Sequence, residues 1–143
     1  MKPLPHRYEV TIAGGAGGYA QLSSAGVPDL RTAPPLEFDG PGDAWSPEQL
    51  LLAAVQSCFL MTFRAVAAAS GIDFTSLRVE AEGTVDRVNG RTRFTEIVLR
   101  PRVVAPAGMD AVRLRRALEK AEHVCLVSAS LSTPIRLEPE PAG

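Results

Sequence analysis

The chain has 143 residues, of which 45% are hydrophobic and 22% are charged. This composition is too apolar for a disordered protein, and the length is typical of one domain. Fifteen basic and sixteen acidic residues give a formal net charge of −1, so the chain lacks the basic excess with which proteins bind nucleic acid. We therefore predict a single domain over residues 1–143 and no nucleic-acid partner.

The N-terminal part of the chain predicts short strands. Residues 6–12 alternate polar and apolar side chains, which is typical of a half-buried strand. A glycine-rich turn follows, and residues 19–23 are predicted to be its hairpin partner. Because no Lys-Ser/Thr pair follows the glycines and no helix opens there, we do not interpret them as a phosphate-binding loop. Prolines and glycines make residues 24–45 loop-like, with a strand around Leu30 or Leu36 as the alternative.

A long central helix is predicted over about residues 46–70. Ser46 is a good N-cap, Pro47 suits the first helical position, and Gln49 completes a capping box. Gly71 is a natural C-terminal stop. The segment is apolar on almost every face, which is typical of a buried helix. Since a single small domain has trouble surrounding such a helix, the pattern indicates that a partner subunit covers one side.

The segment after the central helix predicts a β-hairpin. Residues 77–86 and 92–104 both alternate apolar and polar side chains, and Asn89-Gly90 between them is a strong hairpin signal. Pro101 cannot donate to a ladder of hydrogen bonds, so it argues for an edge or a break in the return strand.

A second helix is predicted to open at Met109-Asp110, with one apolar stripe that ends at Cys125. Residues 134–138 predict a final short strand. Strands in blocks with inserted helices are typical of an α+β fold and not of repeating βαβ units. The expected domain therefore has N-terminal strands within residues 6–45, a central helix over about 46–70, and C-terminal strands and a helix within 77–138.

The expected compartment is the cytoplasm, with no membrane partner. Residues 1–20 carry several charged side chains and lack the apolar segment of a signal peptide. The longest apolar run, residues 50–55, is far shorter than the roughly 20 residues that span a bilayer. Cysteines in such a compartment are expected to be reduced at rest.

The two cysteines are the candidate chemistry-bearing residues. Cys58 lies in the middle of the central helix, and Cys125 lies at the end of the second helix. Free cysteines often only fill a core, and two cysteines with two distant histidines make a poor zinc site. His123 lies two residues before Cys125 and so on another helix face, which argues against a Cys–His nucleophilic pair. The residues alone leave a core role and a redox role open.

Two motifs resemble a known family. The sequence SPEQL at residues 46–50, followed by SCF at 57–59, resembles the long central helix of the OsmC-like family. This family includes osmotically induced protein C and the organic hydroperoxide resistance proteins. The sequence KAEHVCLVS at residues 120–128 resembles the second cysteine site of the family, and FDGPG at 38–42 also fits. The resemblance covers the whole chain in the order of its elements.

The resemblance implies the OsmC-like fold, with two β-sheet blocks around a buried central helix in an intertwined homodimer whose active sites lie at the subunit interface. It also implies an antioxidant, thiol-dependent peroxidase that reduces organic hydroperoxides in the oxidative stress response. Cys58 would be the peroxidatic cysteine, Cys125 the resolving cysteine and Glu48 the active-site glutamate. No metal or organic cofactor is implied, because a dithiol, such as a lipoyl protein, supplies the reducing equivalents.

Glu48 precedes Cys58 by ten residues, which is a rise of roughly 15 Å along a helix. Unless the helix bends, Glu48 can therefore act only on a cysteine of the other subunit. An apolar setting raises the pKa of a thiol, so an opposing charge must stabilise the thiolate.

The sequence departs from the family at the arginine that stabilises this thiolate. Ala16 and Glu37 stand at its two expected places, and Arg31, in the same loop region, is the candidate replacement. This departure motivates the alternative function. In that alternative, the chain is an OsmC-like protein that binds a small lipophilic ligand or has another thiol activity, with little peroxidase turnover.

Overall fold

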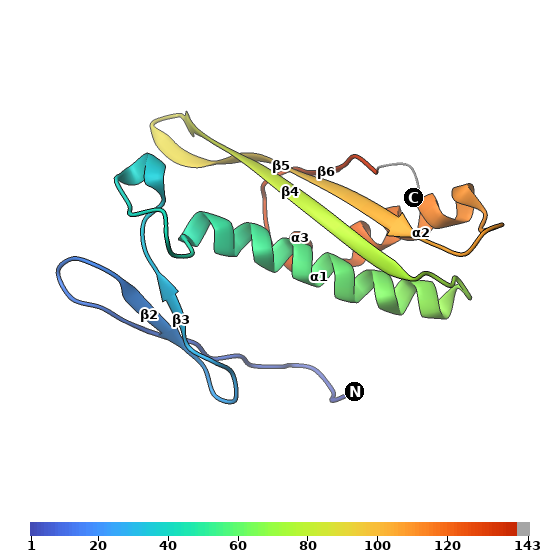
Figure 1. The fold of residues 1–143 in the computed structure, drawn as a ribbon, viewed down its shortest axis with the longest axis horizontal. Coiled ribbons are helices and arrows are strands. Elements are labelled where there is room, and N and C mark those ends of the chain that lie inside the picture. The colour runs from blue at the N-terminus through green and yellow to red at the C-terminus, as the bar shows by residue number, and fades with distance from the viewer. Residues whose placement is uncertain (140–143) are drawn as a thin grey trace. The chain divides into compact units, whose positions relative to one another are not determined.

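The computed structural model describes residues 1–139, which divide into two compact units at Leu50–Leu51. Each unit contains one three-stranded sheet, and a long helix begins in the first unit and continues through the second (Figure 1). Strands in two separate blocks with helices between and after them confirm the α+β class predicted from the sequence.

The first unit is an antiparallel sheet in the order β1-β2-β3, followed by a short 3₁₀ helix η1. The elements are β1 at Thr11–Ala13, β2 at Ala20–Ser23, β3 at Leu30–Thr32 and η1 at Leu36–Phe38. The hairpin around the glycine-rich turn is as predicted. Leu30 lies in a strand, whereas Leu36 lies in η1 because the preceding prolines cannot extend a ladder.

The predicted half-buried strand over residues 6–12 is shorter and more exposed than expected. It begins only at Thr11, because β2 ends opposite at Ser23 and the chain then turns away. Exposed fractions of 67% for Val10 and 60% for Ile12 leave its apolar side chains open to solvent. The first unit therefore presents apolar surface that its own residues do not cover.

Helix α1 spans Pro47–Ala69, in agreement with the predicted 46–70. The predicted capping box is present in both directions. The Gln49 backbone N–H donates to the Ser46 hydroxyl at 3.1 Å, and the Ser46 N–H donates to the Gln49 side-chain oxygen at 3.0 Å. Gly71, with a φ of +67°, takes the left-handed conformation that glycine adopts after a helix end.

Only one side of α1 is buried within the single chain, as expected for a helix that one small domain has trouble surrounding, and the partner subunit over its other side stays a prediction. The buried residues are Val55, Phe59, Phe63, Val66 and Ala67. Exposed residues recur at steps of three and four along the opposite side, and we call them the exposed row of α1: Ala54, Ser57, Met61, Arg64 and Ala68. By length and composition α1 could cross a membrane, a test that the core helix of a soluble protein also passes.

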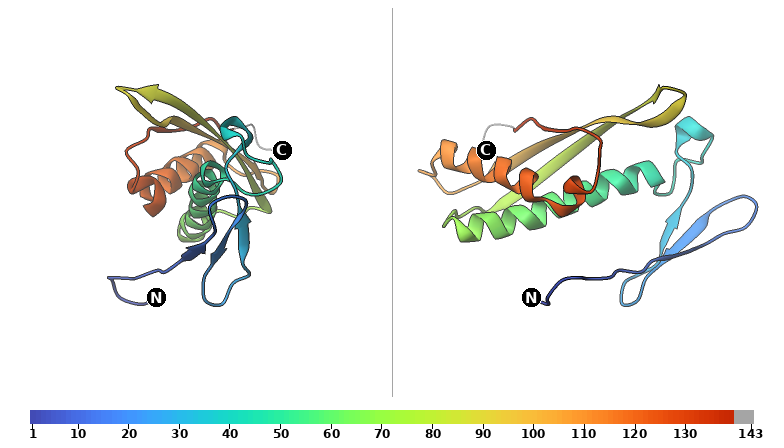
Figure 2. Two further views of the ribbon diagram at one scale, coloured as in Figure 1. Left: turned by 90° about the vertical axis from the view of Figure 1, so that its left-hand side faces the viewer. Right: turned by 180° about the vertical axis from the view of Figure 1, so that it is seen from behind.

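The second unit is a sheet in the order β4-β5-β6 that packs against helices (Figures 1 and 2). Strands β4 and β5 form the predicted antiparallel hairpin, and β6 pairs with β5 in parallel. Helix α2 begins after the N-cap Asp110, whose carboxylate accepts the Val112 N–H at 2.9 Å. The elements are β4 at Ser76–Val88, β5 at Arg91–Val104, α2 at Ala111–Val124, α3 at Leu126–Ala129 and β6 at Ile135–Leu137.

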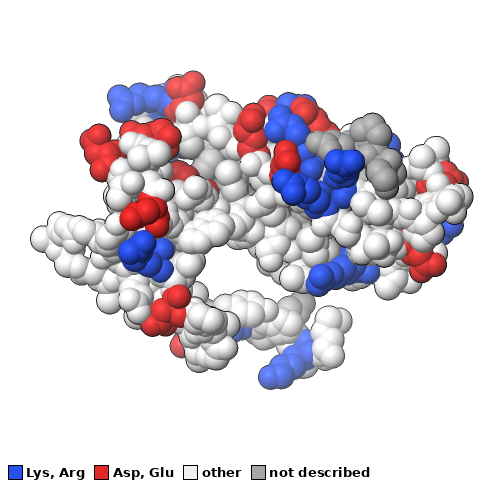
Figure 3. Space-filling model, in the orientation of Figure 1, with Lys and Arg blue, Asp and Glu red and all other residues white. Residues whose placement is uncertain are grey.

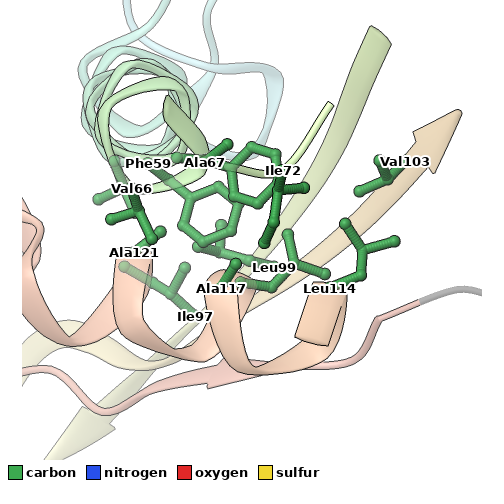
Figure 4. Packing of buried hydrophobic residues seen from close by; sticks show 13 residues of the cluster. Phe59, Val66, Ala67, Ile72, Ile97, Leu99, Val103, Leu114, Ala117 and Ala121 are labelled. Carbon is green, nitrogen blue, oxygen red and sulfur yellow. The ribbon is translucent and has the colours of Figure 1, made fainter. Parts of the chain in front are cut away.

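The core of the second unit lies where α1, β5 and α2 meet (Figure 4). Phe59 from α1 is fully buried, as are Leu99 from β5 and Ala121 from α2. Burying one large apolar side chain stabilises a fold by about 1.5–3 kcal/mol. Because Phe59 directly follows Cys58, this packing fixes the segment of α1 that carries the thiol.

Pro101 lies inside β5 without breaking it. The backbone of Ile97 faces the β6 side of β5, since its N–H donates to Pro134 O at 3.0 Å. Backbone groups alternate sides along a strand, so the nitrogen of Pro101 faces the same side as that of Ile97. The pairing with β6 ends at Leu99, and the missing N–H therefore falls where β5 is locally an edge, as the proline predicted.

Charged side chains gather over the sheet of the second unit with both signs interleaved (Figure 3). Arg100 pairs with Glu138 at 3.2 Å, and Arg136 pairs with Glu96 at 3.2 Å. These partly exposed pairs contribute little individually, but they balance the charge of this surface.

Candidate active site

Cys58 lies midway along α1, at the border between its buried and exposed sides. Its side chain is half-buried, with fully buried Val55 and Phe59 beside it on the helix. Its sulfur lies 3.8 Å from the hydroxyl oxygen of Thr62, one helical turn further along. The thiol is thus held on a rigid helix and in reach of a polar neighbour.

Cys125 lies at a break between two helices and is completely buried. It is the C-cap of α2 and the N-cap of α3, with an extended backbone at ψ 118°. Its carbonyl accepts the Ala129 N–H at 2.9 Å, which starts the single turn of α3. The apolar stripe of α2 predicted Cys125 at the helix end, but no signal in the sequence predicted α3.

The fold brings the two cysteines, 67 positions apart in the sequence, into one site, and both are free thiols. Burial acts to raise the pKa of Cys58. Hydrogen bonds from the Cys125 thiol, the backbone N–H groups of Val127 and Leu126 and the hydroxyl of Thr62 outweigh it and lower this pKa below its ordinary value.

The pKa of Cys125 moves in the opposite direction. Burial raises it, and the hydrogen bond with Cys58 raises it further. Of the two thiols, Cys58 therefore ionises first while Cys125 keeps its proton. A nucleophilic thiolate beside a protonated thiol is the arrangement that a two-cysteine redox cycle needs.

Glu48 lies in the first turn of α1, where the helix dipole favours a negative charge. Its oxygen Oε1 is buried and has no hydrogen-bond partner among the described residues. Ten residues separate Glu48 from Cys58 in this continuous helix, a rise of about 15 Å and a rotation that leaves them about 80° apart around the axis. The helix therefore does not bring Glu48 to the Cys58 of its own chain.

Arg31 is held inside the first unit by Tyr19 and Asp43. Its guanidinium lies 4.2 Å from the centre of the Tyr19 ring and donates to the Asp43 carbonyl oxygen at 3.0 Å. The Tyr19 hydroxyl donates to the Asp43 carboxylate at 2.8 Å, which raises the pKa of Tyr19. Arg31 is thus an ordered, half-exposed cation, and its role toward Cys58 stays a prediction.

Other groups considered from the sequence do not join the site. His123 is exposed whereas Cys125 is buried, in line with the expectation that they face different ways. Over residues 1–139, no three His, Cys, Asp or Glu side chains gather into a metal-binding group. The sequence reasoning missed Thr62, although its spacing of four residues from Cys58 placed both on one helix face.

Comparisons with known proteins give a family from the sequence and the same fold from the structure. A family model described as OsmC-like protein matches residues 40–140. The chain is 35% identical to an uncharacterized protein, YmaD, of Bacillus subtilis, over 74% of this chain and 73% of that protein. It is 34% identical to an organic hydroperoxide resistance protein of Xanthomonas axonopodis pv. citri, over 80% of this chain and 79% of the relative.

Among solved structures, an OsmC-like protein of unknown function from Vibrio cholerae superimposes with a TM-score of 0.88 at 18% identity. The match covers 95% of this chain and all of that one. At this identity the likeness concerns the fold, and it confirms the OsmC-like architecture predicted from the two motifs.

Proposed function

The chain belongs to the family of OsmC-like proteins, and we propose that it reduces organic hydroperoxides, with Cys58 as the peroxidatic and Cys125 as the resolving cysteine. The observation that carries this proposal is the pair of free thiols in one site, Cys58 half-buried on α1 and Cys125 buried at the break after α2; the opposite directions of their pKa shifts support it. The name of the Xanthomonas relative, organic hydroperoxide resistance protein, supports the class of substrate.

The first step is attack of the Cys58 thiolate on the O–O bond of the peroxide. A bond forms between sulfur and one oxygen, and the O–O bond breaks. The leaving alkoxide takes the bonding electron pair and a proton from solvent to become an alcohol. Cys58 is oxidised by two electrons to a sulfenic acid, and the lowered pKa of Cys58 supplies the thiolate that starts the step.

The second step joins the two sulfurs. Cys125 attacks the sulfenic acid of Cys58, a disulfide forms, and the sulfenic oxygen leaves as water with the proton from Cys125. The raised pKa of Cys125 keeps that proton in place during the first step. An external dithiol then returns two electrons and two protons, which restores both thiols.

We place the active site at the interface of a homodimer. The exposed row of α1 consists mostly of small or apolar side chains on a helix that is apolar on nearly every face. A second copy of the chain suits this row, because a helix of this pattern is normally buried. In such a dimer the unpartnered carboxylate oxygen of Glu48 is available to a site completed by the other subunit.

The decisive experiment for the roles of the cysteines uses Cys125→Ser. Without a resolving thiol, cumene hydroperoxide should leave a sulfenic acid on Cys58, which a dimedone probe converts into an adduct that mass spectrometry can locate. The matched variant Cys58→Ser should give no adduct on Cys125. Equal labelling of both variants, or none in either, contradicts the proposal, and the absence of labelling favours the ligand-binding alternative.

A further inference from the structure

We propose that Thr62 is a positioning residue for the reactive sulfur, donating a hydrogen bond that holds the Cys58 thiolate in place. The inference rests on the proposed function and adds a residue to it. A thiolate on a half-buried helix face needs donors close by, because burial disfavours the charged form. Thr62 supplies one from the same helix.

The contact between the two side chains is direct. The Sγ atom of Cys58 and the Oγ1 atom of Thr62 are 3.8 Å apart, and both side chains are half-buried. A helical Ser or Thr hydroxyl commonly bonds to the carbonyl four residues earlier, and Ser130 does so with Leu126 O at 2.8 Å. In α1 the Thr62 hydroxyl instead lies within hydrogen-bonding distance of the Cys58 thiol, four residues earlier.

The other groups that act on Cys58 are neutral. They are the Cys125 thiol and the backbone N–H groups of Val127 and Leu126. In the described part of the chain, no charged side chain is among the main groups that shift the pKa of Cys58. The cation closest along the helix, Arg64, is exposed and donates to the Met61 sulfur at 3.3 Å.

A hydroxyl suits this position because it works in both protonation states. It accepts a hydrogen bond from the S–H of the resting thiol and donates one to the thiolate after ionisation. Thr has two common χ1 rotamers in a helix, and the one that Thr62 adopts places its hydroxyl oxygen 3.8 Å from the sulfur. Within residues 1–139, Thr62 is also the one side-chain donor to Cys58 that can be replaced without removing a redox thiol.

The test compares Thr62→Val with Thr62→Ser in the reduced full-length protein. Valine keeps the shape and removes the donor, whereas serine keeps the donor. Alkylation of Cys58 by iodoacetamide is followed across pH, with the modified peptide quantified by mass spectrometry. Thr92→Val in the exposed part of β5 is the matched control, and Thr62→Ala is the second variant if valine perturbs folding.

We expect Thr62→Val to slow alkylation of Cys58 at neutral pH by about 3- to 10-fold, as the loss of one hydrogen bond of ordinary strength predicts. The rates should converge with those of the wild type at high pH, where the thiolate is fully formed. Thr62→Ser should stay within about twofold of the wild type, on the same reasoning. The inference is overturned if Thr62→Val and the wild type give superimposable profiles of alkylation rate against pH. It is also overturned if Thr62→Ser and Thr62→Val lose the same share of the alkylation rate.

Alkylation requires no peroxide, so the two proposals fail separately. If Thr62→Val slows alkylation of Cys58 but the wild-type protein never consumes peroxide, the inference about Thr62 stands and the proposed function is rejected. If the wild type consumes peroxide but Thr62→Val leaves the pH profile of Cys58 alkylation unchanged, the proposed function stands and the inference about Thr62 is rejected.

Discussion

Replacement of Phe59 by alanine should destabilise the second unit strongly and slow the reaction of its neighbour Cys58. Phe59 is 0% exposed and packs where α1, β5 and α2 meet. Its truncation removes a fully buried ring and leaves a cavity, which costs about 3–5 kcal/mol. That is a large share of the roughly 5–15 kcal/mol that stabilises a typical domain.

The assay is urea unfolding followed by circular dichroism, with Phe38→Ala as the matched control. Phe38 is 55% exposed in η1, so its truncation should cost less than about 1 kcal/mol. We also expect disulfide formation after one equivalent of peroxide to slow in Phe59→Ala, because a loosened α1 no longer holds Cys58 against Cys125. A loss of stability below about 1.5 kcal/mol, or equal losses in both variants, would refute the packing argument.

Three further predictions concern the subunit interface and the two thiols. Ala54→Arg, which puts a bulky charge in the exposed row of α1, should shift the mass in sedimentation from twice 15.2 kDa toward 15.2 kDa; a wild type that sediments as a monomer contradicts the dimer. Glu48→Gln should lower the peroxide rate at least about tenfold, as removal of a charged hydrogen-bonding group does, and stopped-flow kinetics that match the wild type would exclude Glu48 from the site. The pKa of Cys58 is lowered and that of Cys125 is raised, so alkylation of Cys58 should begin at a lower pH than alkylation of Cys125. Mass spectrometry of the two modified peptides across pH that shows the reverse order would contradict the assignment.

Local sequence signals predicted the boundaries of the central helix. The capping box depends only on residues three positions apart, so Ser46 and Gln49 were sufficient to place the start of α1. The hairpin at Asn89-Gly90 is equally local, with a φ of +52° at Asn89 and +77° at Gly90. The register of the flanking strands was not predicted from the sequence, and it shifts by an irregularity between Thr84 and Val85.

Burial was harder to predict, because it depends on what covers a surface. The alternation in residues 6–12 indicated a strand with one face covered, yet Val10 and Ile12 are exposed in the single chain. The apolar pattern of α1 indicated a helix that one small domain cannot surround, and the single chain leaves one of its sides exposed. A sequence pattern indicates that a face is apolar, but it does not indicate which chain covers that face.

The sequence singled out the two thiols, whose catalytic roles stay a prediction, but it did not indicate the groups that surround them. The motif resemblance assigned Cys58 and Cys125 to one site, and the fold brings them together. The donors at Leu126 and Val127 are backbone groups, and they depend on the break at Cys125 that starts α3. A four-residue helix has no periodicity to detect.

Intact-mass measurement of the reduced wild type after one equivalent of cumene hydroperoxide tests the central claim most directly. The account predicts a rapid loss of two hydrogen atoms, which peptide mapping assigns to a Cys58–Cys125 disulfide and which Cys58→Ser does not show. Hydrogen peroxide in parallel should react more slowly. Two free thiols after prolonged exposure, or the same loss of mass in Cys58→Ser, would contradict the account.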